Sequence, residues 1–502
     1  MGGTSDADLK RDDVYRIWGN PRKTKPIDKH QVVPRGKKGN MTQKSTIDRA
    51  ITTNQNEIPV RSQARAKPWG SGILSPFRRV LIGAFLLAVA TGGTRADVVI
   101  DWNVAMTDYA TPRSPAPLGP PAETRVYAMA HLAMLEATQE AQRQHHGVAS
   151  PEAAAAQAAH DVLVHEFADG APAFDALLAL ELAAIAEGPA KINGVALGIE
   201  EAAEMLAARA NDGSATPTGP YTPGTNPGDY QPTPPFDGPP FNGFVDGVNW
   251  GKVTPFVLRR GSQFRAPPPY RVSDLEYTFD LNEVKASGSS HSVARTDDQT
   301  QIAIFWYESS GLGWNRIARI LDAQHTRDLY ESARLFAALN TALADAYIAS
   351  LDSKFAYNFW RPITAIRNAA SDGNDLTTAD PGWEPLLTTP PIPDYPSGHA
   401  AVGAAAATVL IAFFGDENNF TFASTMSAAF PSVGPRTFHR ISDAAKENAT
   451  SRMLVGIHFR LACTVGYEQG LEVGNWVVKQ HHSRHGQEDE PRSGGASGHR
   501  GH

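Results

Sequence analysis

The sequence contains a single cysteine, Cys463, among its 502 residues. One thiol cannot form an intramolecular disulfide, and a metal cluster held by several cysteines is excluded as well. Beyond one apolar segment before residue 97, no uninterrupted apolar run approaches the ~20 residues that a membrane helix requires. These absences argue against an integral membrane protein, and they leave hydrophobic packing as the source of stability.

Positive charge is scarce outside the first part of the chain. Residues 1–79 hold 17 Lys or Arg and 7 Asp or Glu, a balance of +10, and because the net charge is -7 the remaining residues sum to -17. A nucleic-acid-binding protein concentrates positive charge on its folded domain, so nucleic acid is excluded as the main partner. The composition, 41% hydrophobic and 20% charged, is ordinary for a soluble globular protein.

The stretch before residue 97 has the pattern of an export signal. Arg78 and Arg79 precede an apolar run over 80–90, and small residues follow. This order predicts a signal peptide over 76–96, with a twin-arginine route as one option, and hence a secreted or periplasmic protein. An internal core helix is the alternative. The polar, basic residues 1–75 predict a disordered leader, unless translation starts downstream of Met1.

The mature chain is predicted to be all-α. Stretches over 122–210 are rich in Ala, Leu and Glu, with apolar residues recurring at three and four positions, as in amphipathic helices. The same pattern returns over 297–350. Residues 212–270 are dense in Pro and Gly but keep aromatic residues, among them Tyr221, Tyr230, Phe236, Phe241, Phe244 and Trp250. A flexible linker would lack these rings. We therefore expect a helical bundle core with an extended Pro/Gly-rich segment packed on it.

The predicted domain spans 97–479, and its half over 300–479 contains the motifs that follow. The residues after it, 480–502, have low complexity and predict a disordered tail.

The first motif is "KFAYNFWRP", Lys354 to Pro362. If these residues continue one helix, Lys354 and Arg361 share a face, and Pro362 ends or kinks the helix. Two cations beside Phe359 and Trp360 could bind an anion. The alternative is an ordinary solvated basic face.

The second motif is "DYPSGHAAVGAAAATVLIAFF", which begins at Asp394. Ser397 is a good N-cap, and Gly398 lets the backbone approach a ligand closely. The free N–H groups of the first helical turn favour an anion, with His399 at the rim. The alternative is a capped core helix with an incidental histidine.

The third motif is "SRMLVGIHFR", from Ser451 to Arg460. Arg452 and His458 are six residues apart, which places them about a third of a turn apart on an ideal helix. Gly456 would permit close packing at the site. A surface arginine and a satisfied core histidine are the alternative interpretation.

Together the three motifs predict an oxyanion site. Lys354, Arg361 and Arg452 could neutralise a tetrahedral oxyanion, since arginine binds such oxygens in pairs and lysine adds a point charge. Ser397 and the Gly398 N–H would supply further donors. His399 and His458 remain, one to attack or coordinate and one to move protons.

The ordered set K-x6-RP, PSGH and SR-x5-H resembles the signature of the type 2 phosphatidic acid phosphatase and vanadium-dependent haloperoxidase superfamily. The flanking "FWRPITAIR" and "GIHFR" are similar to its bacterial haloperoxidase-like branch. The resemblance covers roughly 97–479, and it implies an all-α fold with the site at the centre of a helical bundle.

The resemblance also implies roles. Vanadate would bind through His458, with its oxygens held by the other predicted cations and donors, Lys354, Arg361, Arg452, Ser397 and Gly398. His399 would be the acid–base group, hydrogen peroxide and halide the substrates, and Lys354 would polarise the peroxide. In the phosphatases the same pocket takes phosphate from a phosphate ester, so His458 would be the nucleophile of a phosphohistidine intermediate.

Three positions depart from the pattern of the superfamily. Many members carry an aspartate four residues after the last histidine, where this chain has Ala462; such a carboxylate orients the histidine and raises its basicity. Some bromide-oxidising members carry a second histidine where this chain has Ile392. Phosphatases often place an arginine where this chain has Phe359 and Trp360, which favours the haloperoxidase-like branch.

Three functions follow from the sequence. The first is a secreted vanadate-dependent haloperoxidase, the second is a secreted phosphatase that uses the same site, and the third is an inactive relative that binds an oxyanion or a partner without turnover. Ala462 is the feature that motivates the third.

Overall fold

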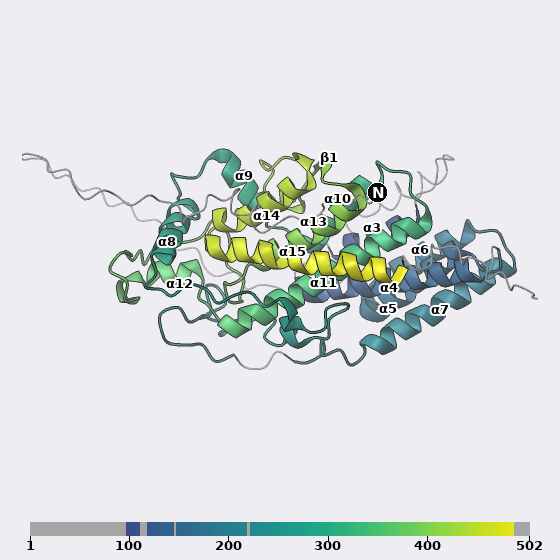
Figure 1. The fold of residues 1–502 in the computed structure, drawn as a ribbon, viewed down its shortest axis with the longest axis horizontal. Coiled ribbons are helices and arrows are strands. Elements are labelled where there is room, and N and C mark those ends of the chain that lie inside the picture. The colour runs from purple at the N-terminus through teal and green to yellow at the C-terminus, as the bar shows by residue number, and fades with distance from the viewer. Residues whose placement is uncertain (1–96, 111–117, 145–146, 218–220, 486–502) are drawn as a thin grey trace, which may run out of the picture. The chain divides into compact units, whose positions relative to one another are not determined.

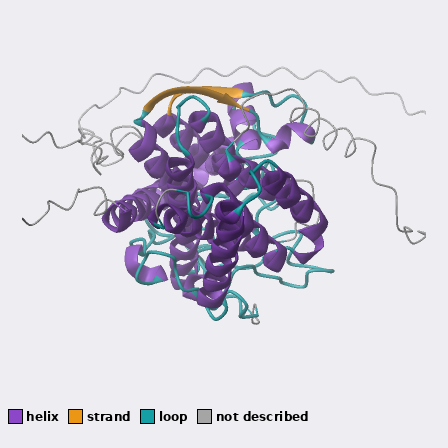
Figure 2. Cartoon of the chain, turned by 90° about the vertical axis from the view of Figure 1, so that its right-hand side faces the viewer, coloured by secondary structure: helices purple, strands orange, loops and turns teal. Residues whose placement is uncertain are grey.

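The computed structural model describes residues 97–110, 118–144, 147–217 and 221–485. The predicted leader over 1–75 and the signal peptide over 76–96 lie outside these residues. Within them the protein forms thirteen α-helices and one two-stranded sheet, and Figure 2 shows how far helix dominates. The all-α prediction is confirmed. None of the helices in the described ranges is both long and apolar enough to cross a membrane.

The first group of helices confirms the helical prediction over 122–210. It consists of α3 (Val98–Ala110), α4 (Pro120–Arg143), α5 (Pro151–Glu166), α6 (Ala171–Ala183) and α7 (Pro189–Arg209). The start of α5 is determined by local hydrogen bonding, because the Ser150 side chain accepts the Ala153 N–H. Pro151 takes the first helical position, where its missing N–H costs nothing. Within this group α5 packs on α4 and α7.

The second group contains the motifs. It consists of α8 (Leu275–Ser287), α9 (Asp297–Phe305), α10 (Ser310–Asp322), α11 (Leu329–Tyr357), α12 (Pro362–Arg367), α13 (Gly398–Phe414), α14 (Ile441–Leu454) and α15 (Arg460–His485). A capping box between Asp328 and Glu331 starts α11. This long helix packs on α4 and on α13 and α15, so it joins the two groups (Figure 1). The helix α15 continues past Lys479, where the predicted domain ends.

The sheet is small. Strands β1 (Glu417–Phe422) and β2 (Arg436–Arg440) pair antiparallel, with Phe420 opposite Phe438. Both rings are buried, so the hairpin covers the bundle with one apolar face.

The Pro/Gly-rich segment lies on the helical body, as predicted. Asp345 of α11 is fully buried, and its carboxylate accepts the N–H groups of Phe256, Val257 and Leu258 at 2.7, 2.9 and 2.9 Å. Three backbone donors on one carboxylate fix the extended chain against the helix, because leaving a buried charge unpaired would be costly.

Two helix predictions are wrong. Lys354 and Arg361 do not share a helix, because α11 ends at Tyr357 and Asn358 takes a left-handed φ of 52°. Asparagine tolerates this conformation at a helix end, and the residue before a proline disfavours helix, so Arg361 is extended and caps α12.

Arg452 and His458 do not share a helix either. The helix α14 ends at Leu454, and Gly456 has a φ of +86°, which a helix cannot accommodate. His458 therefore lies in the connection between α14 and α15. A Cβ on Gly456 would overlap the backbone of Gly288, so the close packing predicted at this glycine is present.

The helices α13 and α15 approach closely along a row of glycines. A Cβ built on Gly470 would overlap the carbonyl of Ala401, and one on Gly466 would overlap the carbonyl of Ser397. The absence of side chains at these two positions therefore sets the distance between the helices.

We expect Gly470→Ala to lower the free energy of unfolding by about 1–3 kcal/mol, the usual cost of overpacking, although alanine is the better helix former. Urea unfolding of the purified protein measures this. Gly434→Ala is the matched control because no atom lies within 4 Å of its Cβ position. Equal stabilities of the two variants would contradict the packing argument.

A buried polar network joins the two groups of helices. Asn103, His131, Asn315 and Asn340 are all fully buried. The Nδ1 of His131 lies 2.8 Å from the Tyr127 carbonyl, and its Nε2 lies 3.2 Å from Asn103 Nδ2. These partners assign the proton to Nδ1. Burial lowers the pKa of His131 from 6.5 to about 4.

This pKa predicts a pH dependence of stability. As pH falls below 6.5, the unfolded chain binds a proton at His131 that the folded protein does not bind. The contribution of neutral His131 to the unfolding free energy is therefore present above pH 6.5 and is lost towards pH 4. The total loss is about 3 kcal/mol. Between pH 7 and 4.5 we expect the wild type to lose about 2–3 kcal/mol more unfolding free energy than His131→Gln. Parallel declines in urea unfolding would contradict this assignment.

Candidate functional site

The structure brings the predicted residues together from five places, each at or beside the end of a helix. They lie at the C-terminal end of α11 (Lys354), before α12 (Arg361), at the start of α13 (Ser397, Gly398, His399), at the end of α14 (Arg452) and before α15 (His458). Each motif therefore stands where a helix starts or ends, and there backbone N–H and C=O groups are free to bind side chains.

The start of α13 has the predicted cap. Ser397 is extended, and its Oγ accepts the Ala400 N–H at 3.4 Å. Its own N–H donates to the Ala462 carbonyl at 2.8 Å. A Cβ on Gly398 would lie 3.9 Å from both Lys354 Cε and a ring carbon of Tyr347. The cap of α13 thus faces the side of α11 that contains the lysine.

Lys354 is buried, with 1% of its surface exposed. Its Nζ donates to the carbonyls of Pro393 and Asp394 at 2.7 and 2.9 Å. Burial, reinforced by the Arg361 guanidinium, lowers the pKa of Lys354 well below its ordinary value. A neighbouring anion would raise the pKa of Lys354 again, because it favours the charged form.

Arg361 is fully buried. Its Nε donates to the Ile392 carbonyl at 2.7 Å and its Nη1 to the Ile457 carbonyl at 2.6 Å. The same Nη1 lies 3.0 Å from Nε2 of His458. Its Nη2 is buried and has no hydrogen-bond partner among the described residues.

Arg452 repeats this arrangement from another direction. Its Nη1 donates to the Trp306 carbonyl at 3.0 Å, and its guanidinium lies 5.4 Å from the ring centre of Tyr307. Its Nε is buried without a partner in the part of the chain that the structure describes. Burial lowers the pKa of Arg452 to about 10.

Both histidines are held neutral. His399 Nε2 lies 3.1 Å from the Glu308 carbonyl, which assigns the proton to that nitrogen. Burial and then Arg452 lower the pKa of His399 well below its ordinary value, and burial and then Arg361 do the same to His458. A neutral imidazole can accept a proton or coordinate through its free nitrogen.

Sequence reasoning missed Asp394. It is fully buried, and its Oδ1 lies 2.9 Å from Nδ1 of His458. The distance suits a hydrogen bond, although the ring does not aim its N–H directly at the oxygen. Burial, opposed by Arg361 and Lys354, raises the pKa of Asp394 to about 7. Only its place two residues before Pro396 could have pointed to it.

Tyr347 was missed too. Its ring contacts the Gly398 position, and its hydroxyl is buried without a hydrogen-bond partner among the described residues. No motif signal marks it, because an aromatic residue in an Ala-rich helix predicts core packing.

The chemistry of this donor set favours an anion. Three buried cations converge with the start of α13, and two guanidinium nitrogens there lack acceptors in the described chain. An unmade hydrogen bond from a buried charged donor is expensive. A tetrahedral oxyanion would supply acceptors to both guanidinium groups at once.

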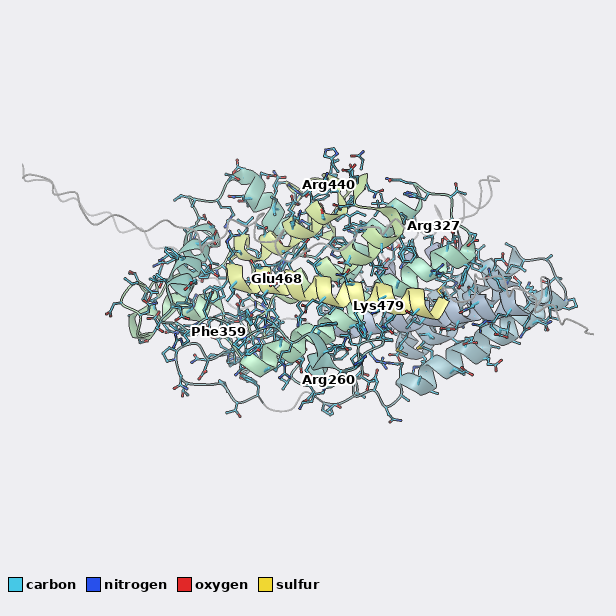
Figure 3. The ribbon with its side chains drawn as sticks, in the orientation of Figure 1. Arg260, Arg327, Phe359, Arg440, Glu468 and Lys479 are labelled. Carbon is cyan, nitrogen blue, oxygen red and sulfur yellow. The ribbon has the colours of Figure 1, made fainter. Side chains whose placement is uncertain are left out.

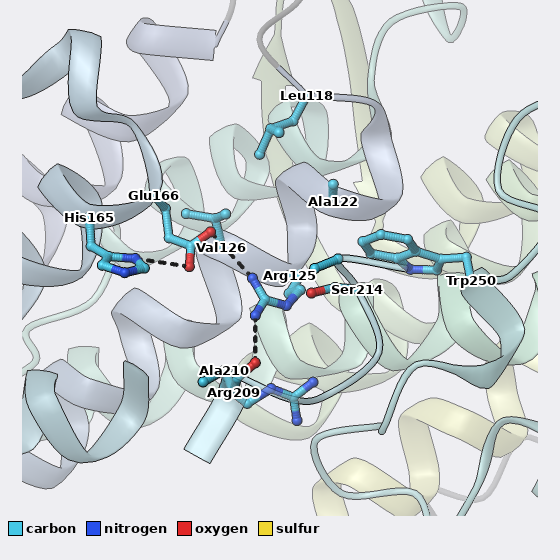
Figure 4. A pocket seen from close by; sticks show the side chains of 11 residues that line it. Leu118, Ala122, Arg125, Val126, His165, Glu166, Arg209, Ala210, Ser214 and Trp250 are labelled. Carbon is cyan, nitrogen blue, oxygen red and sulfur yellow. Dashed lines mark hydrogen bonds and ion pairs between the residues drawn. The ribbon is translucent and has the colours of Figure 1, made fainter. Parts of the chain in front are cut away.

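A cavity elsewhere in the described chain shows the contrast. It has a volume of ≈ 330 Å³ and lies between α4, α7 and the start of the Pro/Gly-rich segment, with Arg125, Arg209 and Trp250 in its lining (Figure 4). The nitrogens of Arg125 bind Asp212 at 2.7 Å, Glu166 at 3.3 Å and the Arg209 carbonyl at 3.1 Å. These arginines are already paired with protein acceptors, so this cavity lacks the unpaired donors of the first site.

We expect inorganic phosphate, a tetrahedral oxyanion, to stabilise the protein. At a hundred times its Kd the gain is about 2.7 kcal/mol of unfolding free energy. Arg452→Ala should lose most of this gain, whereas Arg260→Ala should keep it, because Arg260 is exposed (Figure 3). Thermal unfolding with and without phosphate measures the gain within each variant. An equal gain in both would exclude Arg452 from the site.

Comparison with known proteins finds matches among family models, curated proteins and solved structures. Residues 334–487 match the family model of the VCPO second helical-bundle domain. A vanadium chloroperoxidase from Curvularia inaequalis is 31% identical over 189 residues, 31% of this chain and 30% of that protein. The chain thus matches less than a third of the length of this curated relative.

Two solved structures share the fold. The crystal structure of the first bacterial vanadium-dependent iodoperoxidase has a TM-score of 0.62 and 27% identity, over 76% of this chain and 94% of that one. A holo-type bacterial vanadium-dependent chloroperoxidase has a TM-score of 0.59 and 19% identity, over 74% and 95%. The matches confirm the resemblance to vanadium-dependent haloperoxidases.

Proposed function

We propose that this relative of the vanadium-dependent haloperoxidases binds vanadate and oxidises a halide with hydrogen peroxide. The observation that carries the proposal is the pair of buried guanidinium nitrogens, Arg361 Nη2 and Arg452 Nε, that lack acceptors among the described residues. They lie in one site with the His458 ring, whose Nε2 faces the Arg361 guanidinium at 3.0 Å.

The residues present fit vanadate. His458 Nε2 would be the metal ligand, because Nδ1 faces the Asp394 carboxylate. The predicted cations and capping residues would hold the oxygens: Lys354, Arg361, Arg452, Ser397 and the Gly398 N–H. When bound, vanadate supplies the activation of hydrogen peroxide towards attack by halide.

His399 is the acid–base group in this proposal. Its Nε2–H donates to the Glu308 carbonyl, which fixes the ring and leaves Nδ1 as the basic nitrogen. Arg452, Lys354 and Arg361 disfavour a second proton on the ring. His399 therefore starts neutral and can accept a proton from a bound peroxide or water.

The runner-up is a phosphatase. One observation favours it: His458 has a carboxylate partner in Asp394 at 2.9 Å, and an oriented, basic histidine is what a phosphohistidine mechanism requires. Phosphate and vanadate are both tetrahedral oxyanions, so the same cations would serve either reaction. Secretion or a periplasmic location is part of both proposals and rests on the predicted signal peptide.

One experiment separates the candidates. The purified protein, with and without vanadate, is assayed for peroxide-dependent halogenation of a phenol dye with iodide, bromide and chloride, and in parallel for hydrolysis of an aryl phosphate. We expect vanadate-dependent halogenation. His458→Ala should reduce it at least ~100-fold, because the metal ligand is lost. His439→Ala, an exposed histidine, is the control.

Phosphate release that vanadate inhibits would instead establish the phosphatase. If a folded sample has neither activity, the protein is a non-catalytic oxyanion-binding relative. Full activity in His458→Ala would overturn the site itself.

A further inference from the structure

The position where many superfamily members carry an aspartate supplies no polar side chain here. Ala462 is fully buried in the first turns of α15. Its carbonyl accepts the Ser397 N–H at 2.8 Å, so this residue packs directly against the cap of α13. His458 must find a carboxylate elsewhere if it has one.

Asp394 supplies that carboxylate from a different part of the chain. Its side chain lies 2.9 Å from His458 Nδ1, and the Phe459 N–H also faces its carboxylate. Its backbone is fixed on both sides: the N–H donates to the Phe359 carbonyl at 2.9 Å, and the carbonyl accepts from Lys354 at 2.9 Å. The backbone of Asp394, at the start of the second motif, is thus held by the first motif, and its carboxylate lies against His458 of the third.

The geometry also distinguishes the two nitrogens of His458. Nδ1 faces a carboxylate, which can only accept unless it is protonated, so Nδ1 should carry the hydrogen. Arg361 Nη1, which can only donate, lies 3.0 Å from Nε2 and 3.4 Å from Nδ1, so its closer contact is with Nε2, which should present its lone pair. Both contacts select the same tautomer.

We propose that Asp394 is a positioning residue that holds His458 as the Nδ1–H tautomer, with the Nε2 lone pair directed at the oxyanion site. It takes the place of the carboxylate that position 462 lacks. The expected consequence of this tautomer, tighter vanadate binding, rests on the proposed function. The tautomer itself does not depend on that function.

The charge of Asp394 adds a second effect. When Nε2 bonds to an oxyanion centre, positive charge grows on the imidazole, and a carboxylate at 2.9 Å stabilises it. The carboxylate also offsets part of the repulsion among Lys354, Arg361 and Arg452, which lie near the same ring.

Two variants separate shape from charge. Asp394→Asn keeps an oxygen that can accept from Nδ1–H but removes the charge, whereas Asp394→Leu removes both. Asp322→Asn is the matched control, a buried aspartate beside Arg327 outside the site. All are made in the full chain and checked for folding by circular dichroism and thermal unfolding.

The first readout is vanadate binding by isothermal titration calorimetry. Loss of a partner that orients a metal-ligating histidine typically costs about 10–100-fold in affinity. We expect such a loss in Asp394→Leu, a smaller loss in Asp394→Asn and none in the control. Wild-type affinity in both Asp394 variants would overturn the proposal. If the leucine variant fails to fold, the asparagine variant still decides, because unchanged affinity there removes the role of the charge.

The second readout is the ¹⁵N shift of the two His458 ring nitrogens, assigned by comparison with His458→Ala, in protein without vanadate. We expect a protonated Nδ1 and an unprotonated Nε2 in the wild type, and a mixed or reversed tautomer in Asp394→Leu. The opposite wild-type tautomer would sink the inference even where vanadate binds. If the wild type has the expected tautomer but binds neither vanadate nor phosphate, the proposed function is wrong and the tautomer assignment stands.

Discussion

The structure depends on one constraint: three cationic side chains, Lys354, Arg361 and Arg452, are buried side by side, each with at most 1% of its surface exposed. Removing a charged group from water costs several kcal/mol even after relaxation. Five backbone carbonyls offset part of this cost, and all of them come from connections between helices: Trp306, Ile392, Pro393, Asp394 and Ile457. A helical carbonyl is already bonded within its helix, so the cations can be satisfied only where helices stop. This explains why every motif lies at a helix end.

The same constraint explains how far sequence reasoning succeeds. The all-α fold follows from Ala- and Leu-rich periodicity, which is local, and the cap at Ser397 follows from the residue itself. The two predictions that placed Arg361 and His458 on helices shared with their partners fail, because each assumed that helix continues through the motif. Asn358 and Gly456, with their positive φ angles, end those helices. The helices have to end there because the buried cations need free backbone carbonyls as acceptors.

Asp394 shows a different limit. In the linear pattern of the superfamily, Ala462 stands where many members have a carboxylate. A side chain acts through its place in space, and the carboxylate reaches His458 from the segment before α13. No spacing rule predicts that contact, because the two residues are far apart along the chain and neither lies in a regular element. The role of an acid two residues before the PSGH motif can be inferred only when the position of His458 is known.

The close approach of α13 and α15 ties these parts together. Gly466 and Gly470 bring the backbone of α15 against that of α13, and the Ser397 N–H bonds the Ala462 carbonyl at the point where the helices meet. His458 lies two residues before α15, and Ser397 caps α13, so this contact fixes the distance between the histidine and the cap. A side chain at position 466 would separate them. An oxyanion must be contacted from both sides at hydrogen-bond distance. A carboxylate from the segment around Asp394 orients His458 without adding volume to the contact between the helices. This is a physical reason for a small residue at position 462.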